Sequence, residues 1–456
     1  MQGSLSPIEV VILAAGQGKR MASALPKVLH TLAGRPLLTH VLDAAEVLRP
    51  AAVHVVYGHG GERVPQAFPE ARVDWIRQAE QRGTGHALAC ALPRLAADAI
   101  ALVLLGDVPL SAPRTLAALC ERAYHGLALL TFTARDDNQY GRIVRDEAGR
   151  ILRIVEWRDA TAAERALIEV NSGILAARVA DLRRWLPKLS PANAQNELYL
   201  TDVIALAHAE GCAIESVGPA DPAEVQGVNS RADLAALERA YQERQARALM
   251  DAGVQLLDPR RLDVRGRLTT GRDVVIDVGC VFEGDVHLED EVRVGPYCVI
   301  GNTRIRAGAR IAAHSVLDGA DVGAGAVVGP FARLRPGTVL GVHARVGNFV
   351  EVKGSTIGAD SKINHLSYVG DATVGRAVNI GAGVITCNYD GARKHRTIIG
   401  DQAFIGSDTQ LVAPVEIGAG ATIGAGSTVT KDAPAGELTL SRVAQKTVSG
   451  WRRPEK

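Results

Sequence analysis

A glycine-rich segment near the N-terminus carries the first residues that could do chemistry. It runs from Leu13 through two glycines to Arg20, and Lys27 follows shortly after it. Glycines let a backbone approach a phosphate closely, and backbone N–H groups with basic side chains can neutralise its charge. A dinucleotide-binding fingerprint would need a further glycine where Met21 stands. The segment therefore indicates phosphate binding of another kind, or else an ordinary turn between a strand and a helix.

An acidic residue after a second apolar run is the next candidate. Asp107 follows the run 100–105 and Gly106, and Val108 and Pro109 come after it. Mg²⁺ is usually held by one or two carboxylates together with substrate phosphates, and ligands of α/β sheets bind beyond the carboxyl ends of strands. Asp107 could hold such an ion against phosphate oxygens, or it could simply cap a helix.

Polar residues also interrupt an aliphatic repeat in the C-terminal half of the chain. Outward-facing positions of a repeat are polar without any functional reason, so each residue alone is a weak signal. The run from Asn364 to Asp371 strengthens it, and so does segment 386–398, which breaks the repeat and must leave it as a loop. Loops that leave a rigid scaffold commonly build binding and catalytic sites. We therefore expect a second site at Arg335, Lys353, His365, Tyr368, Asn379 and Asn388-Tyr389.

The first two candidates lie within an alternating pattern of elements. Apolar, β-branched runs predict buried parallel strands, and helical patterns lie between them. This alternation predicts a doubly wound, Rossmann-like α/β domain, whose ligands would bind at the turns after Ala15 and Leu105. The predicted strands are 8–15, 53–57, 100–105 and 127–133, and the predicted helices include 36–48 and 84–97.

One long helix is predicted between the two halves of the chain. Ser230 with Asp233 three residues later forms a start similar to a capping box, and Gly253 is a plausible stop. We therefore expect an N-terminal domain over 1–229, a connecting helix over 230–252 and a C-terminal domain over 253–456.

The C-terminal half repeats itself with a period of six residues. Aliphatic residues recur from Leu288 to Val429, mostly in steps of six and sometimes of five, with a break at 386–398. Neither a helix nor an alternating strand has this period, whereas a triangular parallel β-helix does, because one aliphatic side chain per face points inward and small residues fit the corners. Of the 47 glycines, 26 fall in 271–430 and only 17 in the longer stretch 1–229. The narrow interior also accounts for the low share of aromatic residues, 4%.

Composition argues against several classes of protein. The 456 residues carry a net charge of +1, so no strong global field points to nucleic acid or to a membrane surface. The chain has no run of about 18 apolar residues, which predicts no membrane insertion. The six cysteines are scattered and form no CxxC pair, which argues against structural zinc and predicts a reducing, cytoplasmic compartment.

Two motifs together carry a resemblance to a known family. The segment Leu13-Ala-Ala-Gly16, with Gly18, Arg20-Met21 and Pro26-Lys27 after it, resembles the signature of nucleotidyltransferases that join a nucleoside triphosphate to a sugar 1-phosphate. Together with a hexapeptide β-helix, this signature makes the chain similar to a bacterial bifunctional family, that of N-acetylglucosamine-1-phosphate uridylyltransferase and glucosamine-1-phosphate N-acetyltransferase. The resemblance extends over roughly residues 8–453. The resemblance implies a left-handed coil for the β-helix, Mg²⁺ as cofactor and a homotrimer with sites between subunits.

The same resemblance implies the reactions. The C-terminal domain would acetylate glucosamine 1-phosphate with acetyl-CoA, and the N-terminal domain would then transfer a uridylyl group from UTP to N-acetylglucosamine 1-phosphate. The products are UDP-N-acetylglucosamine, a precursor for the cell wall, and pyrophosphate. Two other interpretations stay open: the same fold acting on another sugar or nucleotide, and a β-helix that only trimerises a nucleotidyltransferase or serves a regulatory complex. The intact set His365, Arg335, Lys353 and Asn388 argues against such a scaffold.

For the uridylyl-transfer site, the resemblance implies roles for single residues. Arg20 and Lys27 would be catalytic, because they neutralise phosphate charge. Asp107 and Asn229 would be the ligands of Mg²⁺. The implied contacts of the nucleotide and the sugar nucleotide are Leu13, Ala14, Ala15, Gly16, Lys27, Gln78, Gly83, Thr84, Leu105, Gly106, Asp107, Gly141, Glu156, Asn171 and Asn229.

For the acetyl-transfer site, the resemblance implies that His365 is the general base. An amine must lose a proton while it attacks the thioester, and an imidazole is suited to take it. The implied contacts of the sugar phosphate are Arg335, Lys353, Tyr368 and Asn379. The implied contacts of acetyl-CoA are Ala382, Asn388, Tyr389, Ser407, Ala425 and Arg442.

Overall fold

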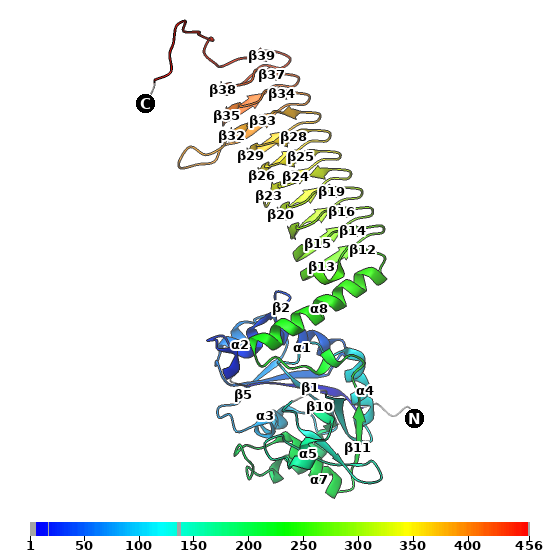
Figure 1. The fold of residues 1–456 in the computed structure, drawn as a ribbon. Coiled ribbons are helices and arrows are strands. Elements are labelled where there is room, and N and C mark those ends of the chain that lie inside the picture. The colour runs from blue at the N-terminus through cyan, green and yellow to red at the C-terminus, as the bar shows by residue number, and fades with distance from the viewer. Residues whose placement is uncertain (1–5, 17, 135–137, 455–456) are drawn as a thin grey trace. The chain divides into compact units, whose positions relative to one another are not determined.

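The structure is a computed structural model that describes residues 6–16, 18–134 and 138–454, with only the backbone of Lys19. It separates into two compact units, Met1–Tyr241 and Gln242–Lys456, each of which has its own hydrophobic core (Figure 1). The boundary between them falls inside α8 (Arg231–Asp251). The functional domain boundaries at 229 and 252 stay a prediction.

A mixed sheet forms the centre of the N-terminal unit. Its main path runs β11-β7-β10-β6-β1-β4-β5, and the hairpin of β8 and β9 joins it at β10. The predicted strands are present within one residue of their expected bounds. β10, which no apolar run singled out, lies antiparallel to both of its neighbours. The strands are β1 (Ile8–Ala14), β4 (Ala52–Tyr57), β5 (Asp74–Arg77), β6 (Ile100–Leu105), β7 (Gly126–Thr133), β8 (Arg142–Arg145), β9 (Ile151–Val155), β10 (Glu169–Arg178) and β11 (Ala213–Val217), with a small separate hairpin of β2 (Thr31–Leu32) and β3 (Arg35–Pro36).

Helices cover both faces of this sheet, as the doubly wound prediction requires. Along β1, Val10 and Ile12 belong to the core on one face, whereas Val11 and Leu13 belong to the core on the other. A strand that is buried on both faces must be apolar throughout, which explains the unbroken run of the sequence. The helices are α1 (Leu37–Glu46), α2 (Arg63–Gln66), α3 (Thr84–Ala91), α4 (Pro113–Ala123), α5 (Ala162–Arg165), α6 (Val179–Trp185) and α7 (Val203–Ala209).

The order of the strands decides where the N-terminal site can lie. β1 pairs in parallel with β4 on one side and with β6 on the other, and Leu13 lies opposite Leu105. The turns after these two strands therefore leave the sheet side by side. Residues from the glycine-rich segment and from the Asp107 segment meet at this edge because both follow neighbouring parallel strands.

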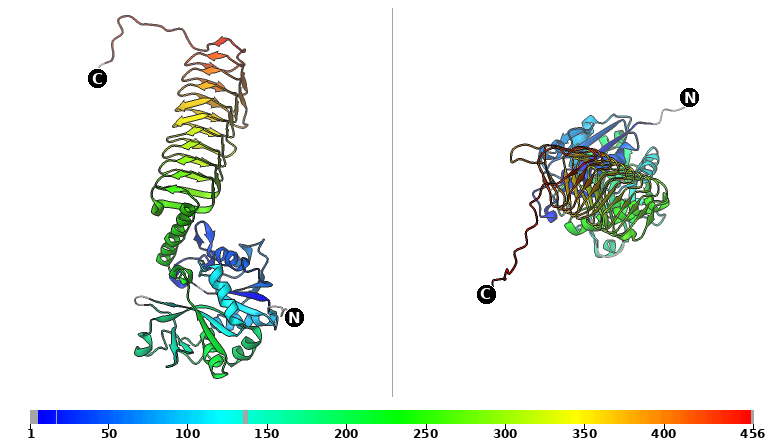
Figure 2. Two further views of the ribbon diagram at one scale, coloured as in Figure 1. Left: turned by 90° about the vertical axis from the view of Figure 1, so that its right-hand side faces the viewer. Right: turned by 90° about the horizontal axis from the view of Figure 1, so that it is seen from above.

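The C-terminal unit is a parallel β-helix whose coils stack regularly (Figure 2). In the described residues, each coil gives one strand to an 11-stranded sheet; the coils from Arg293 to Ile417 give two strands to a 17-stranded sheet, whereas the first two coils give it one nine-residue strand each. The strands of the smaller sheet are β12 (Gln255–Leu256), β14 (Val275–Ile276), β16 (Arg293–Val294), β19 (Arg310–Ile311), β22 (Val327–Val328), β25 (Arg345–Asn348), β28 (Lys362–His365), β31 (Asn379–Ile380), β34 (Phe404–Ile405), β37 (Thr422–Ile423) and β39 (Leu438–Thr439).

The larger sheet covers the other two sides of the coil. Its strands are β13 (Leu262–Thr270), β15 (Cys280–Leu288), β17 (Val299–Gly301), β18 (Arg304–Ile305), β20 (Val316–Asp318), β21 (Asp321–Val322), β23 (Arg333–Leu334), β24 (Val339–Leu340), β26 (Glu351–Lys353), β27 (Thr356–Ile357), β29 (Tyr368–Gly370), β30 (Ala372–Val374), β32 (Ile385–Cys387), β33 (Thr397–Ile399), β35 (Gln410–Val412), β36 (Val415–Ile417) and β38 (Thr428–Val429).

The six-residue period has the predicted physical meaning. Ile311, Leu317 and Val322 are inward-facing residues of successive sides and are all buried in one continuous core. Glycines allow close stacking at the corners: a Cβ on Gly341 would lie 2.6 Å from the backbone nitrogen of Ala359 in the next coil. The predicted break lies between β32 and β33, where the chain leaves the coil as a loop (Figure 1).

Within the described ranges, no helix has the length and apolar character that crossing a membrane requires.

The stack of coils predicts unequal costs for two adjacent substitutions. Leu340 is 2% exposed, whereas Val339 beside it is 42% exposed. We expect Leu340→Ala to lower the free energy of unfolding by about 2–5 kcal/mol, because it empties part of the core. Val339→Ala, as the control, costs much less. Urea unfolding followed by circular dichroism measures both, and equal losses would contradict the inward placement of Leu340.

Candidate functional site

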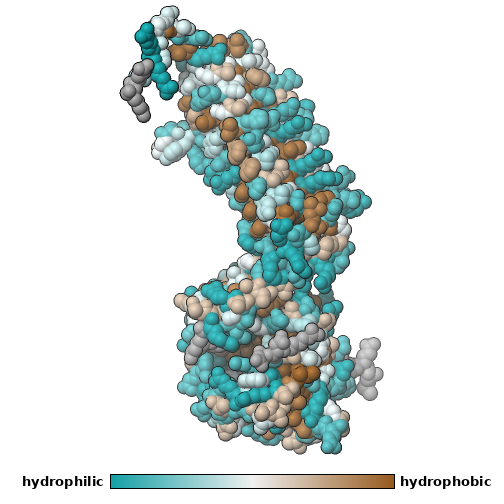
Figure 3. Space-filling view, in the orientation of Figure 1, coloured by the Kyte–Doolittle hydropathy of each residue, from teal (hydrophilic) through white to brown (hydrophobic). Residues whose placement is uncertain are grey.

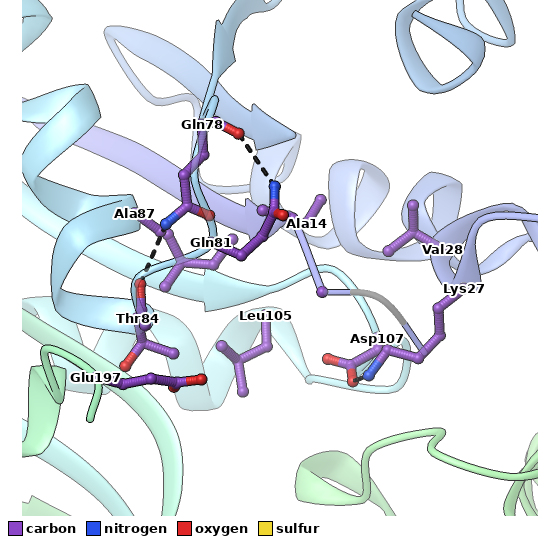
Figure 4. Close-up of a pocket in the computed structure, with 14 residues that line it drawn as sticks. Ala14, Lys27, Val28, Gln78, Gln81, Thr84, Ala87, Leu105, Asp107 and Glu197 are labelled. Carbon is purple, nitrogen blue, oxygen red and sulfur yellow. Dashed lines mark hydrogen bonds and ion pairs between the residues drawn. The ribbon is translucent and has the colours of Figure 1, made fainter. Parts of the chain in front are cut away.

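A cavity of about 520 Å³ opens at the carboxyl edge of the N-terminal sheet (Figure 4). Its walls come from the end of β1, from the segment before α3 and from the end of β6. The structure therefore brings together segments that are far apart in the sequence. The predicted residues in its wall are Leu13, Ala14, Ala15, Gly16, Lys27, Gln78, Gly83, Thr84, Leu105 and Asp107. Val28, Gln81, Ala87 and Glu197 also line it and were not predicted.

Hydrogen bonds hold the segment around Gln78 against this cavity. Gln78 is buried, and its side-chain amide donates to the carbonyl oxygen of Gly83 at 3.2 Å. Gly83 has a φ of +104°, and a Cβ there would lie 2.6 Å from the carbonyl oxygen of Leu198. The hydroxyl of Thr84 accepts from the backbone N–H of Leu200 at 3.1 Å. Only glycine fits this turn, which gives the predicted Gly83-Thr84 pair a defined place in the wall.

A second cavity, of about 250 Å³, adjoins the first and shares Leu105 and Asp107 with it. Asn171 is held there by its backbone N–H, which donates to Gly141 at 2.9 Å, and by its side-chain oxygen, which accepts from the backbone of Gly173 at 3.1 Å. The predicted residues that line it are Leu105, Asp107, Gly141, Glu156, Asn171 and Asn229. Gln139, Tyr140 and Ser172 line it too, and no sequence signal marked them.

A lysine ammonium lies between the two predicted metal ligands, where the two cavities meet. Lys27 forms an ion pair with Asp107, and its Nζ lies 3.4 Å from Oδ1 of Asn229. The carboxylate of Asp107 and the amide oxygen of Asn229 therefore face one positive charge from two sides. Hard oxygen donors around a cation are the kind of site that Mg²⁺ prefers, so these residues fit the ion. Among the residues described, no group of three or more His, Cys, Asp or Glu could hold a metal by itself.

Two predicted residues of the N-terminal site lie outside both cavities. Arg20 is exposed on the short helical turn Lys19–Met21, and it is not among the residues that line either cavity. Gly106 does not line them either, but its backbone N–H donates to the carbonyl oxygen of Leu13 at 2.9 Å and so joins the two turns. Gln17 of the glycine-rich segment lies outside the described residues.

The β-helix brings four predicted residues into one column. His365, Ala382, Ser407 and Ala425 each follow an inward isoleucine by two positions, and these isoleucines belong to β28, β31, β34 and β37. Because these strands are neighbours in parallel register, the four residues lie one above another at one corner of successive coils. Arg442 is tied to the same column, since its guanidinium donates to the carbonyl oxygen of Ala425 at 2.7 Å.

A cluster of charged and polar side chains lies on the next face of the coil. Arg335 pairs with Glu351 at 3.0 Å, and Lys353 lies 3.4 Å from Asp371. Asn388 enters the cluster from the loop, where its amide donates to Asp371 at 2.5 Å and lies 3.5 Å from the Tyr368 hydroxyl. Glu351 and Asp371 were not predicted as members of the site; their spacing of one coil from the predicted cations could have identified them. Tyr389, by contrast, is exposed in the loop.

Asn379 lies on another face of the coil than this cluster. It belongs to β31 of the smaller sheet and lines a groove of about 480 Å³ together with Arg345 and Lys362. Tyr368 and Lys353 belong to the larger sheet. Within one chain, the predicted contacts of the sugar phosphate are therefore divided between two faces, with His365 at the corner between them.

Comparison with known proteins accounts for both units. A family model described as MobA-like NTP transferase domain matches residues 10–257, and one described as bacterial transferase hexapeptide (six repeats) matches residues 396–431. A model of the GMPPB C-terminal domain matches residues 264–357. The chain is 58% identical to the bifunctional protein GlmU of Bordetella parapertussis over 98% of this chain and 99% of that protein. It is also 58% identical to the GlmU of Aromatoleum aromaticum over 98% and 99%, and to that of Methylobacillus flagellatus over 99% and 98%.

The chain belongs to the family of bifunctional GlmU proteins. It is therefore an enzyme with two transferase activities, one for an acetyl group and one for a uridylyl group. This confirms the family and the fold class that the sequence predicts. The roles of single residues stay predictions.

Burial gives Glu156 an unusual environment in the smaller cavity. Burial raises the pKa of Glu156 above its ordinary value of 4.5; Asp202 and Asp159 raise it further, while the hydrogen bond from Thr201 opposes them. A raised pKa in the folded state means that folding disfavours the charged carboxylate. The loss of stability from this charged carboxylate is absent below the ordinary pKa and grows as the pH rises through the raised pKa.

We therefore expect Glu156→Gln to stabilise the N-terminal unit at pH 7 and to leave its stability at pH 4 nearly unchanged. Urea midpoints at several pH values measure the difference, with the exposed Glu147→Gln as control. A variant that is less stable than the parent at pH 7 would contradict the cost of the buried charge.

Proposed function

We propose that the two adjoining cavities bind UTP and N-acetylglucosamine 1-phosphate, with the reacting phosphates near Lys27. The observation that supports this most is the meeting of one ammonium, one carboxylate and one amide oxygen at the junction of the cavities. The larger cavity has room for the nucleoside, and the smaller one offers Glu156 and Asn171 to sugar hydroxyls.

In this reaction an oxygen of the sugar phosphate attacks the α-phosphorus of UTP, and pyrophosphate leaves. A phosphate is already an anionic nucleophile, so no general base is needed. Lys27 and Arg20 neutralise charge on the phosphates, and the walls around Gln78 and Asn171 hold the two reactants in line. Asp107 and Asn229 would hold Mg²⁺, which when bound offsets negative charge on phosphate oxygens.

The second reaction, which comes first in the synthesis, is the acetylation of glucosamine 1-phosphate by acetyl-CoA. The amine nitrogen attacks the carbonyl carbon of the thioester while Nε2 of His365 takes the proton, and the bond to sulfur breaks as coenzyme A leaves. Arg335, Lys353, Tyr368 and Asn379 bind the sugar phosphate. The column of Ala382, Ser407 and Ala425, with Asn388, Tyr389 and Arg442, binds acetyl-CoA.

We also propose that the enzyme acts as a homotrimer in the cytoplasm. Support comes from the divided contacts of the sugar phosphate, which a neighbouring copy would complete, and from apolar side chains that reach the surface of the β-helix (Figure 3). Val316 and Phe331, for example, are 42% and 47% exposed. All six cysteines are free thiols, as a reducing compartment allows.

The two sites predict opposite effects of two substitutions. Purified enzyme with glucosamine 1-phosphate, acetyl-CoA, UTP and Mg²⁺ should release both coenzyme A and pyrophosphate. We expect His365→Ala to reduce coenzyme A release by about 100-fold or more, since a general base contributes that much, and to spare uridylyl transfer from supplied N-acetylglucosamine 1-phosphate. Asp107→Ala should do the reverse. Full acetyl transfer by His365→Ala would refute its role as base, and loss of both activities in either variant would refute independent sites.

The position of Lys27 predicts competition with a metal ion. Without substrates, an incoming Mn²⁺ must displace the ammonium from Asp107. We expect Lys27→Met to bind Mn²⁺ about fivefold more tightly, because an ion pair of this kind is worth about 1 kcal/mol. Titration followed by electron paramagnetic resonance measures bound Mn²⁺, with Arg35→Met, which breaks the pair with Asp43, as control. Unchanged or weaker binding would mean that the metal and the ammonium do not share this place.

A further inference from the structure

Asn348 lies directly beneath His365 in the stack of coils. The two residues end β25 and β28, and the parallel register places them opposite each other. Nδ1 of His365 lies 3.0 Å from the side-chain oxygen Oδ1 of Asn348. An amide oxygen can only accept a hydrogen bond, so this contact requires the proton of a neutral imidazole to be on Nδ1. Nε2 is then left with a free lone pair.

We propose that Asn348 is the positioning residue that holds His365 in the tautomer needed for acetyl transfer. The proposal rests on the proposed role of His365 as general base. A base must present an unprotonated nitrogen to the amine, and the tautomer of a histidine is set by the hydrogen bond that its other nitrogen makes. Asn348 supplies that bond, so Nε2 of His365 is the atom that receives the proton.

The corner of the coil gives Asn348 the rigidity that this role needs. Its backbone carbonyl accepts from the N–H of Leu366 at 3.1 Å, so its main chain and its side chain both bind the coil that carries His365. On that coil, the hydroxyl of Ser367 donates to the carbonyl oxygen of His365 at 2.8 Å. His365 is exposed, and without these hydrogen bonds its side chain would keep several rotamers until substrate binds. The entropy cost of fixing one rotamer would then fall on substrate binding.

The same corner is apolar in the three coils directly below Asn348. The equivalent positions, two residues after the inward aliphatic residues of β22, β19 and β16, are Pro330, Ala313 and Pro296. None of these side chains can hydrogen-bond. Among these four coils, the polar group therefore occurs at the position from which it reaches the imidazole.

The neutral charge of the amide also matters. Around His365, β25 carries one charged side chain, Arg345, and β28 itself carries Lys362. β31 carries no charged side chain, and β29, the next strand along the chain, begins with the titratable Tyr368. The carboxylate of Asp360, earlier on the same coil, faces His343 at 3.6 Å. An amide fixes the tautomer without favouring the protonated imidazole, whereas a carboxylate in its place would favour the form that cannot act as a base.

Two substitutions of Asn348 separate the tautomer from simple packing. Asn348→Leu has a similar volume but no acceptor, and we expect kcat/KM for acetyl transfer to fall by at least about tenfold, a part of what a general base contributes. Asn348→Asp keeps the acceptor and adds a negative charge. We expect it to retain much of the activity at high pH. As the pH is lowered, its activity should begin to fall at a higher pH than that of the parent. Both are measured as pH profiles of coenzyme A release on the full-length enzyme.

Three controls make the outcome decisive. Each variant must keep the parent's urea unfolding transition of the full-length chain, followed by circular dichroism, which shows that the β-helix is folded, and must release pyrophosphate like the parent, which shows that the N-terminal unit is intact. Asn302→Leu removes a corner asparagine of an earlier coil, whose Oδ1 accepts from the backbone of Asp285 at 3.3 Å, and should leave acetyl transfer unchanged. The positioning role of Asn348 is wrong if Asn348→Leu keeps the parent rate and Asn348→Asp keeps the parent pH profile. If His365→Ala is inactive in the same assay, the role of His365 as general base is still supported. If His365→Ala is active, the proposed function itself fails.

Discussion

Parallel pairing of strands is the constraint on which both sites depend. In a parallel ladder, residues at equivalent positions of neighbouring strands lie side by side, so a chemical group is placed by the register of its strand. In the N-terminal unit this register sets Leu13 beside Leu105 and so brings two turns to one edge. In the β-helix it stacks His365 on Asn348 and continues the column through Ala382. The two folds differ, but they place side chains by the same backbone hydrogen bonds.

Charge balance governs the N-terminal site. Its phosphate substrates bring several negative charges, yet the chain offers carboxylates there as well as cations. The pairing of Lys27 with Asp107 resolves this, because each neutralises the charge of the other. Glu156, in contrast, has the carboxylates of Asp202 and Asp159 nearby, and burial raises its pKa. The same small volume thus holds one carboxylate paired with a cation and another whose pKa is raised by burial.

The β-helix solves a different problem, which is to build a site from a rigid surface. Its core is almost entirely aliphatic, and every coil repeats the same corners, so specificity depends on departures from the repeat. The loop between β32 and β33 brings Asn388 over the face of Lys353 and Asp371. Asn379 remains on another face, so one chain presents the parts of a site without closing it. This incompleteness and the exposed apolar side chains are the two observations that support the proposed trimer.

What the sequence determined by itself is local. The apolar run before Gly16 and the six-residue period each predict a backbone shape, because both signals are complete within a few residues, and the structure has those shapes at the expected places. In the N-terminal unit, the candidate residues that the motifs marked line the two cavities, apart from Arg20 and Gly106. Only the tertiary structure decided which groups touch. Lys27 meets Asn229 across 202 positions, and Asn348 meets His365 across 17. These contacts depend on strand order and on which side chains turn toward each other at a corner, which no local pattern encodes.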